Sequence, residues 1–152
     1  MQDQLIYNFF DDDEFLRISN KIKEMEKKTA GEIRVSIKEK KSFFQRNKTL
    51  KLLAEEEFFR LGMNKTSDKT GILIFLLLKE RQFYILADKG IDEKVAPATW
   101  NSIKDKMQDM FSKGEFSKGI LFGIEEVGKI LSSYFPLKAD DKDELSNRII
   151  IN

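Results

Sequence analysis

The chain contains neither cysteine nor histidine. Their absence excludes disulfides, thiolate nucleophiles, Cys/His zinc sites and any catalytic triad that uses imidazole as its base. A metal site would have to be built from oxygen ligands, which suit Ca²⁺, Mg²⁺ or Mn²⁺. Acid–base chemistry would fall to Asp, Glu, Lys or Tyr side chains.

Long apolar runs are also missing. No stretch approaches the roughly eighteen apolar residues of a membrane-spanning helix, and residues 1–5 do not have the pattern of a secretory signal. We therefore expect a cytoplasmic protein without membrane association. No Gly-Lys-Ser/Thr triplet is present, so the sequence offers no phosphate-cradling loop of the P-loop kind.

Charge of one sign does not dominate. The net charge is +1, with 41% apolar and 35% charged residues, a profile typical of a soluble globular domain. We predict a single domain over residues 1–136, a polar C-terminal tail over 137–152, and a monomer.

The segment 38–51 is basic and contains Phe43 and Phe44. RNA binding is one interpretation, but the overall charge balance favours a solvated loop that leads into a helix, and no nucleic-acid partner.

Hydrophobic periodicity predicts the order helix, strand, helix, strand, strand, helix, helix. The acidic run 11–14 suits the start of the first helix, and Gly31 suits its end. The strand 33–37 alternates apolar and polar residues, whereas 72–78 and 83–87 are apolar on both faces, as in central strands covered by helices. The other helices are expected at 49–61, from Pro97 to before Gly114, and at about 115–135.

These elements predict an α/β fold, a three-layer α/β/α sandwich around a short mixed sheet with a central β-hairpin. The apolar segment 149–151 of the tail has three interpretations. It adds to a sheet edge, docks on a partner, or is a frayed terminus, which we favour.

Chain geometry brings acidic residues together. A helical crossover makes the first two strands parallel, so Glu32 lies at the same edge as the start of the second strand. The hairpin returns Asp88 to that edge, next to Asp68. We therefore predict a cluster of Glu32, Asp68 and Asp88, with Asp92 and Glu93 within reach.

Clustered carboxylates repel unless solvent, lysines or a cation intervene. Lys65, Lys69 and Lys89 lie in the same loops and would give a balanced polar rim. The alternative is a divalent-cation site, for Ca²⁺ rather than Mg²⁺, without the single-loop ligand spacing of an EF-hand. The tetrad at 68–71 spells the aspartyl-phosphate signature of P-type ATPases. We interpret it as coincidence, because there the aspartate follows a strand and here it precedes one.

Four motifs in this order resemble the TPM domain family over about residues 8–136. They are Thr29-Ala30-Gly31-Glu32-Ile33-Arg34-Val35, Phe59-Arg60-Leu61-Gly62-Met63-Asn64-Lys65-Thr66 with Thr70-Gly71-Ile72-Leu73-Ile74, Ala87-Asp88-Lys89-Gly90-Ile91, and Phe116-Ser117-Lys118-Gly119-Ile120. The resemblance implies the same α/β/α sandwich. It also implies metal binding and phosphate-ester hydrolysis at the loops around Glu32, Asp68 and Asp88, since family members are described as an acid phosphatase or as calcium-binding.

Three functions follow as hypotheses. The favoured one is a binding or regulatory module that holds a calcium-like ion through the loop carboxylates. The second is a metal-assisted phosphatase acting on phosphomonoesters, in which the cation would activate water. The third is an interaction protein without a ligand, which meets a protein partner through Phe43-Phe44 or the segment 149–151.

Overall fold

The computed structural model describes residues 4–66, 68–137 and 149–151. The sheet consists of β1 (Glu32–Lys38), β2 (Gly71–Leu77), β3 (Gln82–Ala87) and β4 (Ile150–Ile151). The helices are α1 (Gln4–Tyr7), α2 (Asp12–Glu26), α3 (Leu50–Arg60), α4 (Lys89–Asp92), α5 (Pro97–Ser112) and α6 (Phe116–Tyr134), with short 3₁₀ turns η1 (Phe43–Gln45) and η2 (Met63–Lys65).

The strands form a mixed sheet in the order β3-β2-β1-β4. β1 and β2 are parallel, as the α3 crossover predicts, and β2 and β3 form the antiparallel hairpin. β4 pairs with β1 in parallel through Ser36↔Ile150 and Ile37↔Ile151. The sheet-edge interpretation of 149–151 therefore holds in place of the frayed terminus. Most of the predicted tail lies outside the described residues.

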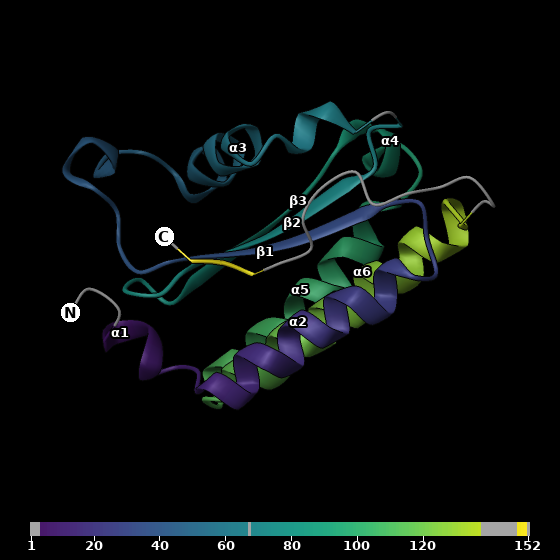
Figure 1. The fold of residues 1–152 in the computed structure, drawn as a ribbon. Coiled ribbons are helices and arrows are strands. Elements are labelled where there is room, and N and C mark those ends of the chain that lie inside the picture. The colour runs from purple at the N-terminus through teal and green to yellow at the C-terminus, as the bar shows by residue number, and fades with distance from the viewer. Residues whose placement is uncertain (1–3, 67, 138–148, 152) are drawn as a thin grey trace.

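Helices cover both faces of this sheet, which confirms the predicted α/β/α sandwich (Figure 1). α3 covers one face, where Leu53 and Phe58 meet Leu73 and Phe75 of β2. α2, α5 and α6 cover the other face and enclose the larger core. β2 is buried at every position. It pairs with β1 over Gly71–Leu77 and with β3 over Ile72–Leu77, whereas β1 has a partner on its other side at two residues only.

The second hairpin strand departs from the prediction. β3 was expected to be central, but it forms the edge of the sheet, and only Ile85 is buried along it. Its apolar residues are half-covered by packing partners on both faces, such as Phe111 for Phe83, with ring centroids 5.0 Å apart. Apolar residues along a strand indicate that helices pack against it. Because helices also pack against the edge strand beside β2, this pattern does not distinguish an edge strand from a central one.

Helix ends follow the local sequence signals in most places. Asp11 caps α2 and forms a capping box with Glu14, and Pro97 occupies the first turn of α5. Gly62 and Gly114 adopt positive φ after α3 and α5. Gly31 was expected to end α2 in this way, but α2 already ends at Glu26, and Gly31 has no positive φ.

Three glycines on α6 allow the helices on the larger face to approach closely. An added Cβ would lie 2.5 Å from the Phe111 ring at Gly119, 2.7 Å from Met107 at Gly123, and 2.6 Å from Met25 at Gly128. Gly119 and Gly123 thus face α5, whereas Gly128 faces α2. The methionines are flexible, but the Phe111 ring is held against Phe83 and Phe116.

Replacing Gly119 with alanine should therefore destabilise the protein. Alanine favours a helix by about 1 kcal/mol over glycine, but displacing a packed aromatic ring typically costs about 1–3 kcal/mol. We expect Gly119→Ala to lower the free energy of unfolding in urea, and the exposed neighbour Lys118→Ala to leave it nearly unchanged. A variant more stable than the parent would contradict this packing.

Candidate functional site

Three segments that are distant in sequence meet at the end of the sheet where β2 begins. The Glu32 N–H donates to the Thr70 carbonyl over 3.2 Å, and the Asp88 N–H donates to the Gly71 carbonyl over 2.9 Å. The Gly90 N–H donates to the Lys69 carbonyl, also over 2.9 Å. The backbone thus brings the predicted acidic segments to one edge.

Gly90 makes this meeting possible. A Cβ at this position would lie 2.3 Å from the Asp68 carbonyl oxygen and 2.6 Å from that of Lys69. Both atoms belong to the backbone and cannot swing aside as a side chain could. Only a glycine therefore lets the loop before β2 rest against the first turn after β3.

The Glu32 carboxylate does not face this edge. The residue is 2% exposed and lies on the α3 face, in line with Arg34 and Ser36. Its Oε2 is 4.0 Å from Arg34 Nη1, which in turn is 3.7 Å from Glu26 Oε2. Glu26 reaches β1 from the end of α2 and accepts a 2.7 Å hydrogen bond from the Ile33 N–H. Glu32 belongs to this buried ion-pair cluster.

The polar residues of β1 alternate with its apolar residues, and both faces of the strand are buried. Ser36 donates to Glu57 of α3, and Glu57 accepts two 2.8 Å hydrogen bonds from Arg60. The hydrogen bonds that Arg60 donates to the Glu57 carboxylate are the main reason that the pKa of Arg60 is raised above its usual value. Apolar and polar residues alternate along β1 because its two faces pack differently: one face makes apolar contacts, and the other makes ion pairs and hydrogen bonds.

Gly71 at the start of β2 and the side chain of Met63 lie between Glu32 and Asp88. The sheet register places Gly71 beside Glu32, and the Asp88 N–H bonds to Gly71 on the other side. Two strand spacings of about 4.8 Å separate their backbones by about 10 Å. Met63 covers Gly71, with its Cε 3.3 Å from where a Cβ would stand, so its side chain lies over the residue between the two acids.

The other four predicted residues, Asp68, Asp88, Asp92 and Glu93, form what we call the acidic rim. Asp68, Asp92 and Glu93 are exposed, and Asp88 is half-buried. Asp88 precedes α4, and its Oδ1 accepts a 2.8 Å hydrogen bond from the Lys89 N–H. Its Oδ2 is buried and accepts no hydrogen bond from the described part of the chain.

Lysines do not balance the acidic rim in the way that one interpretation of the sequence suggested. Within the described ranges, no ion pair of 4 Å or less involves a carboxylate of the acidic rim. Lys69 instead donates to the Asn64 carbonyl over 2.8 Å. Nor do three or more acidic side chains of the described residues gather closely enough to hold a metal ion. A cation here would meet one or two carboxylates, with backbone oxygens and water as its remaining ligands.

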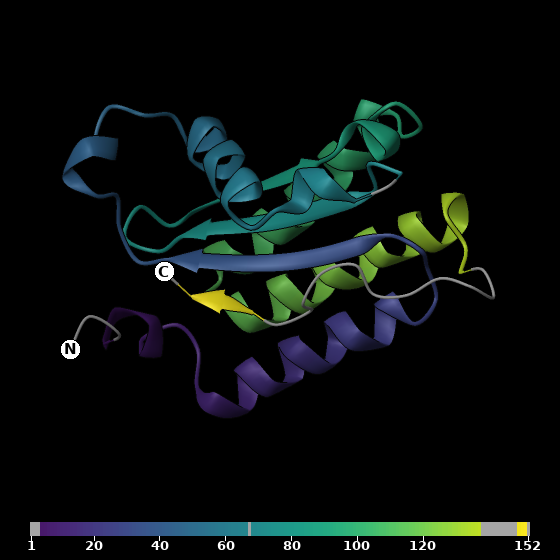
Figure 2. The ribbon, with the colours of Figure 1, turned by 45° about the horizontal axis from the view of Figure 1, so that its top comes forward.

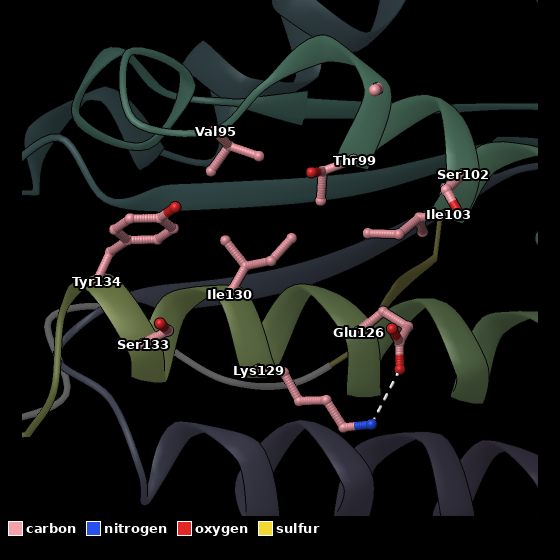
Figure 3. Close-up of a pocket in the computed structure, with 10 residues that line it drawn as sticks. Val95, Thr99, Ser102, Ile103, Glu126, Lys129, Ile130, Ser133 and Tyr134 are labelled. Atoms are coloured by element: carbon pink, nitrogen blue, oxygen red, sulfur yellow. Dashed lines mark hydrogen bonds and ion pairs between the residues drawn. The ribbon is translucent and has the colours of Figure 1, made fainter.

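A pocket of about 530 Å³ lies between the first half of α5 and the last half of α6 (Figure 3). Val95, Ile103 and Ile130 supply apolar surface, and hydroxyl groups come from residues such as Thr99 and Tyr134. Lys129 points away from Val95 and pairs with Glu126 over 3.1 Å. The sequence did not signal this pocket, because hydroxyl residues on the outer faces of helices look like ordinary solvated positions.

The mixed sheet, its helical layers and a loop-built end with carboxylates define a small α/β/α sandwich domain. The chain matches the family model of the TPM domain over residues 6–130. It belongs to the TPM domain family, as the four motifs predicted. No helix among the described residues is both long and apolar enough to cross a bilayer.

Solved structures agree with this assignment. The chain is similar to the BA42 protein from the psychrophilic bacterium Bizionia argentinensis, with 34% identity and a TM-score of 0.84. That match covers 95% of this chain and 96% of the other. The N-terminal domain of a protein from P. gingivalis shares the fold, with a TM-score of 0.67 at 16% identity, over 84% of this chain and 79% of the other. A search of curated proteins gave no match.

The buried ion-pair cluster around Arg34 should be a structural element. Removing the guanidinium would leave Glu26 and Glu32 close together in a site shielded from water, and breaking such a pair typically costs about 3–5 kcal/mol. We expect Arg34→Met to lose stability of this order in urea unfolding. Lys21→Met, which removes half-exposed ion pairs with Glu24 and Glu125, should lose less than about 1 kcal/mol. If both variants lost the same free energy of unfolding, the buried ion-pair cluster around Arg34 would contribute no more to stability than the half-exposed ion pairs of Lys21.

Proposed function

We propose that this TPM domain is a binding module that takes up a divalent cation at the acidic rim, Ca²⁺ in preference to Mg²⁺. The observation that carries the proposal is the Asp88 carboxylate. One of its oxygens is engaged by the Lys89 N–H, and the other is buried without a donor from the described residues. A buried anionic oxygen without a donor is costly, and a bound cation would remove that cost.

Asp92 supports the same site. Its N–H donates to the Asp88 carbonyl over 3.0 Å, so the two acids are one helical turn apart and their Cβ atoms lie within about 6 Å. Like charges at this spacing repel each other, and a cation between them would reverse the sign of that interaction. The Asp68 segment contacts the same turn through Gly90 and brings the backbone carbonyl oxygens of Asp68 and Lys69 close to it.

The donor set favours Ca²⁺. The chain has no histidine or cysteine, so the ligands are hard oxygens, which suit both Ca²⁺ and Mg²⁺. Mg²⁺ needs near-ideal octahedral geometry, whereas Ca²⁺ accepts irregular sets of carboxylates, carbonyls and waters. Because few side chains contribute, we expect a dissociation constant of about 10⁻⁴–10⁻³ M, as in weak calcium modules.

Glu32 is outside the proposed site, because its carboxylate is buried against Arg34 on the α3 face. Binding would act on the loop before β2 and on α4, and would order the end of the sheet where three segments meet.

Phosphomonoester hydrolysis and a protein partner stay predictions, since no geometry among the described residues singles out a nucleophile or a general base.

A Ca²⁺ titration followed by amide NMR tests the proposal. We expect shifts confined to residues 64–71 and 87–95. Asp88→Asn should weaken binding by roughly tenfold or more, since affinity follows the number of charged ligands, while asparagine still caps α4. Asp109→Asn, which removes an exposed carboxylate paired with Lys113, is the matched control.

Glu32→Gln separates the structural from the binding role. It should lower stability and leave the Ca²⁺ affinity of the folded protein unchanged. Shifts spread over the whole surface, or equal affinities of Asp88→Asn and Asp109→Asn, would overturn the proposed site.

A further inference from the structure

The loop between β1 and α3 carries two exposed aromatic residues at its tip. Phe43 is 69% exposed and Phe44 is 86% exposed. They are adjacent in the η1 turn, with ring centroids 5.7 Å apart and planes at 82°. Figures 1 and 2 show this loop, in blue, extending past the end of the sheet opposite to α4. Adjacent phenylalanines at the tip of a protruding loop are not explained by packing within the domain.

Basic side chains surround this tip. Residues 38–51, which we call the basic loop, hold six lysines and arginines and one glutamate, a net charge of +5 in a chain whose net charge is +1. Two of the lysines are partly neutralised, because Lys41 is 3.8 Å from Glu80 and Lys48 pairs with Glu56. No carboxylate of the described residues lies within 4 Å of Lys40, Arg46 or Lys51.

The neighbouring carboxylates do not cancel this charge. Glu39, the one acid of the basic loop, accepts a hydrogen bond from the Ile6 N–H over 3.1 Å and is therefore directed toward α1. The hairpin turn next to the basic loop adds Lys79 and Arg81 to this end of the molecule, together with Glu80, whose carboxylate lies 3.8 Å from Lys41.

We propose that the basic loop docks this domain on an anionic lipid bilayer, with Phe43 and Phe44 inserted at the level of the headgroups. Peripheral docking needs no spanning helix. It needs apolar side chains that enter the interface and cations that meet anionic lipids, and stable attachment usually requires both signals together. The basic loop presents both within a few residues, at the end of the molecule away from the acidic rim.

Single-stranded nucleic acid is the other anionic polymer that binds aromatic and basic residues together. It needs open ring faces on which bases stack, along a basic groove. One face of Phe43 is covered by the Arg46 guanidinium, 4.0 Å from the ring centroid, and the two rings meet edge to face. The pair forms a wedge, not a stacking platform, which favours the bilayer.

Co-sedimentation with vesicles tests the proposal on the full chain. We expect binding to vesicles of phosphatidylcholine mixed with phosphatidylglycerol, weakening as salt is added, and much less binding to phosphatidylcholine alone. The double variant Phe43→Ser, Phe44→Ser should bind roughly tenfold more weakly or worse, because burial of one phenylalanine already corresponds to such a factor. Phe59→Ser is the matched control, since Phe59 is 66% exposed on α3, outside the basic loop.

A fluorescence measurement tests insertion separately. The only tryptophan, Trp100, is 8% exposed in the core, so Phe44→Trp adds one reporter at the tip. Its emission should shift to the blue on anionic vesicles and be quenched by brominated lipid. Binding to a single-stranded oligonucleotide but not to vesicles would overturn the proposal, as would equal vesicle binding of the Phe43/Phe44 and Phe59 variants. Co-sedimentation without the spectral shift would overturn insertion of the tip.

Discussion

The parallel pairing of β1 with β2 is the constraint on which the rest of this TPM domain depends. Parallel neighbours need a crossover, and α3 with its flanking loops supplies it on one face of the sheet. β2 is then enclosed by strands on both sides, by α3 above and by the α2–α5–α6 layer below. The connection leaves β1 at one end of the sheet and returns to β2 at the other, so the two long loops of the crossover lie at opposite ends.

This separation gives the molecule two chemically different ends. The end where β2 begins gathers Asp68, Asp88 and the turn after β3, and backbone hydrogen bonds tie it together. One of these bonds, from Gly90 to Lys69, needs a glycine at position 90. The other end carries the basic loop with Phe43 and Phe44. A cation at the first end and an anionic surface at the second would therefore act on the same domain without competing for residues.

The candidate site was predictable at the level of the backbone and not at the level of side chains. The helical crossover predicts that β1 and β2 are parallel, and the short connection between the two apolar strands predicts the hairpin, so the meeting of the segments around Glu32, Asp68 and Asp88 could be foreseen. The direction of the Glu32 carboxylate could not, because it depends on Arg34 and on Glu26, which reaches β1 from the end of α2. Met63, which covers Gly71 between the two acids, comes from a turn whose path no local pattern specifies.

By itself the sequence determined the class of fold, the main helices and strands, the oxygen-only chemistry of any metal site and membership of the TPM domain family. These follow from residue types and their spacing along the chain, which local backbone preferences translate directly into elements. Only the tertiary structure decided that β3 lies at an edge, that 150–151 pairs with β1, and that the polar face of β1 is a buried ion-pair cluster. Each of these features depends on the free energy of contacts between segments that are distant in sequence. A given apolar or charged residue is compatible with several tertiary arrangements, and only its packing partners select one of them.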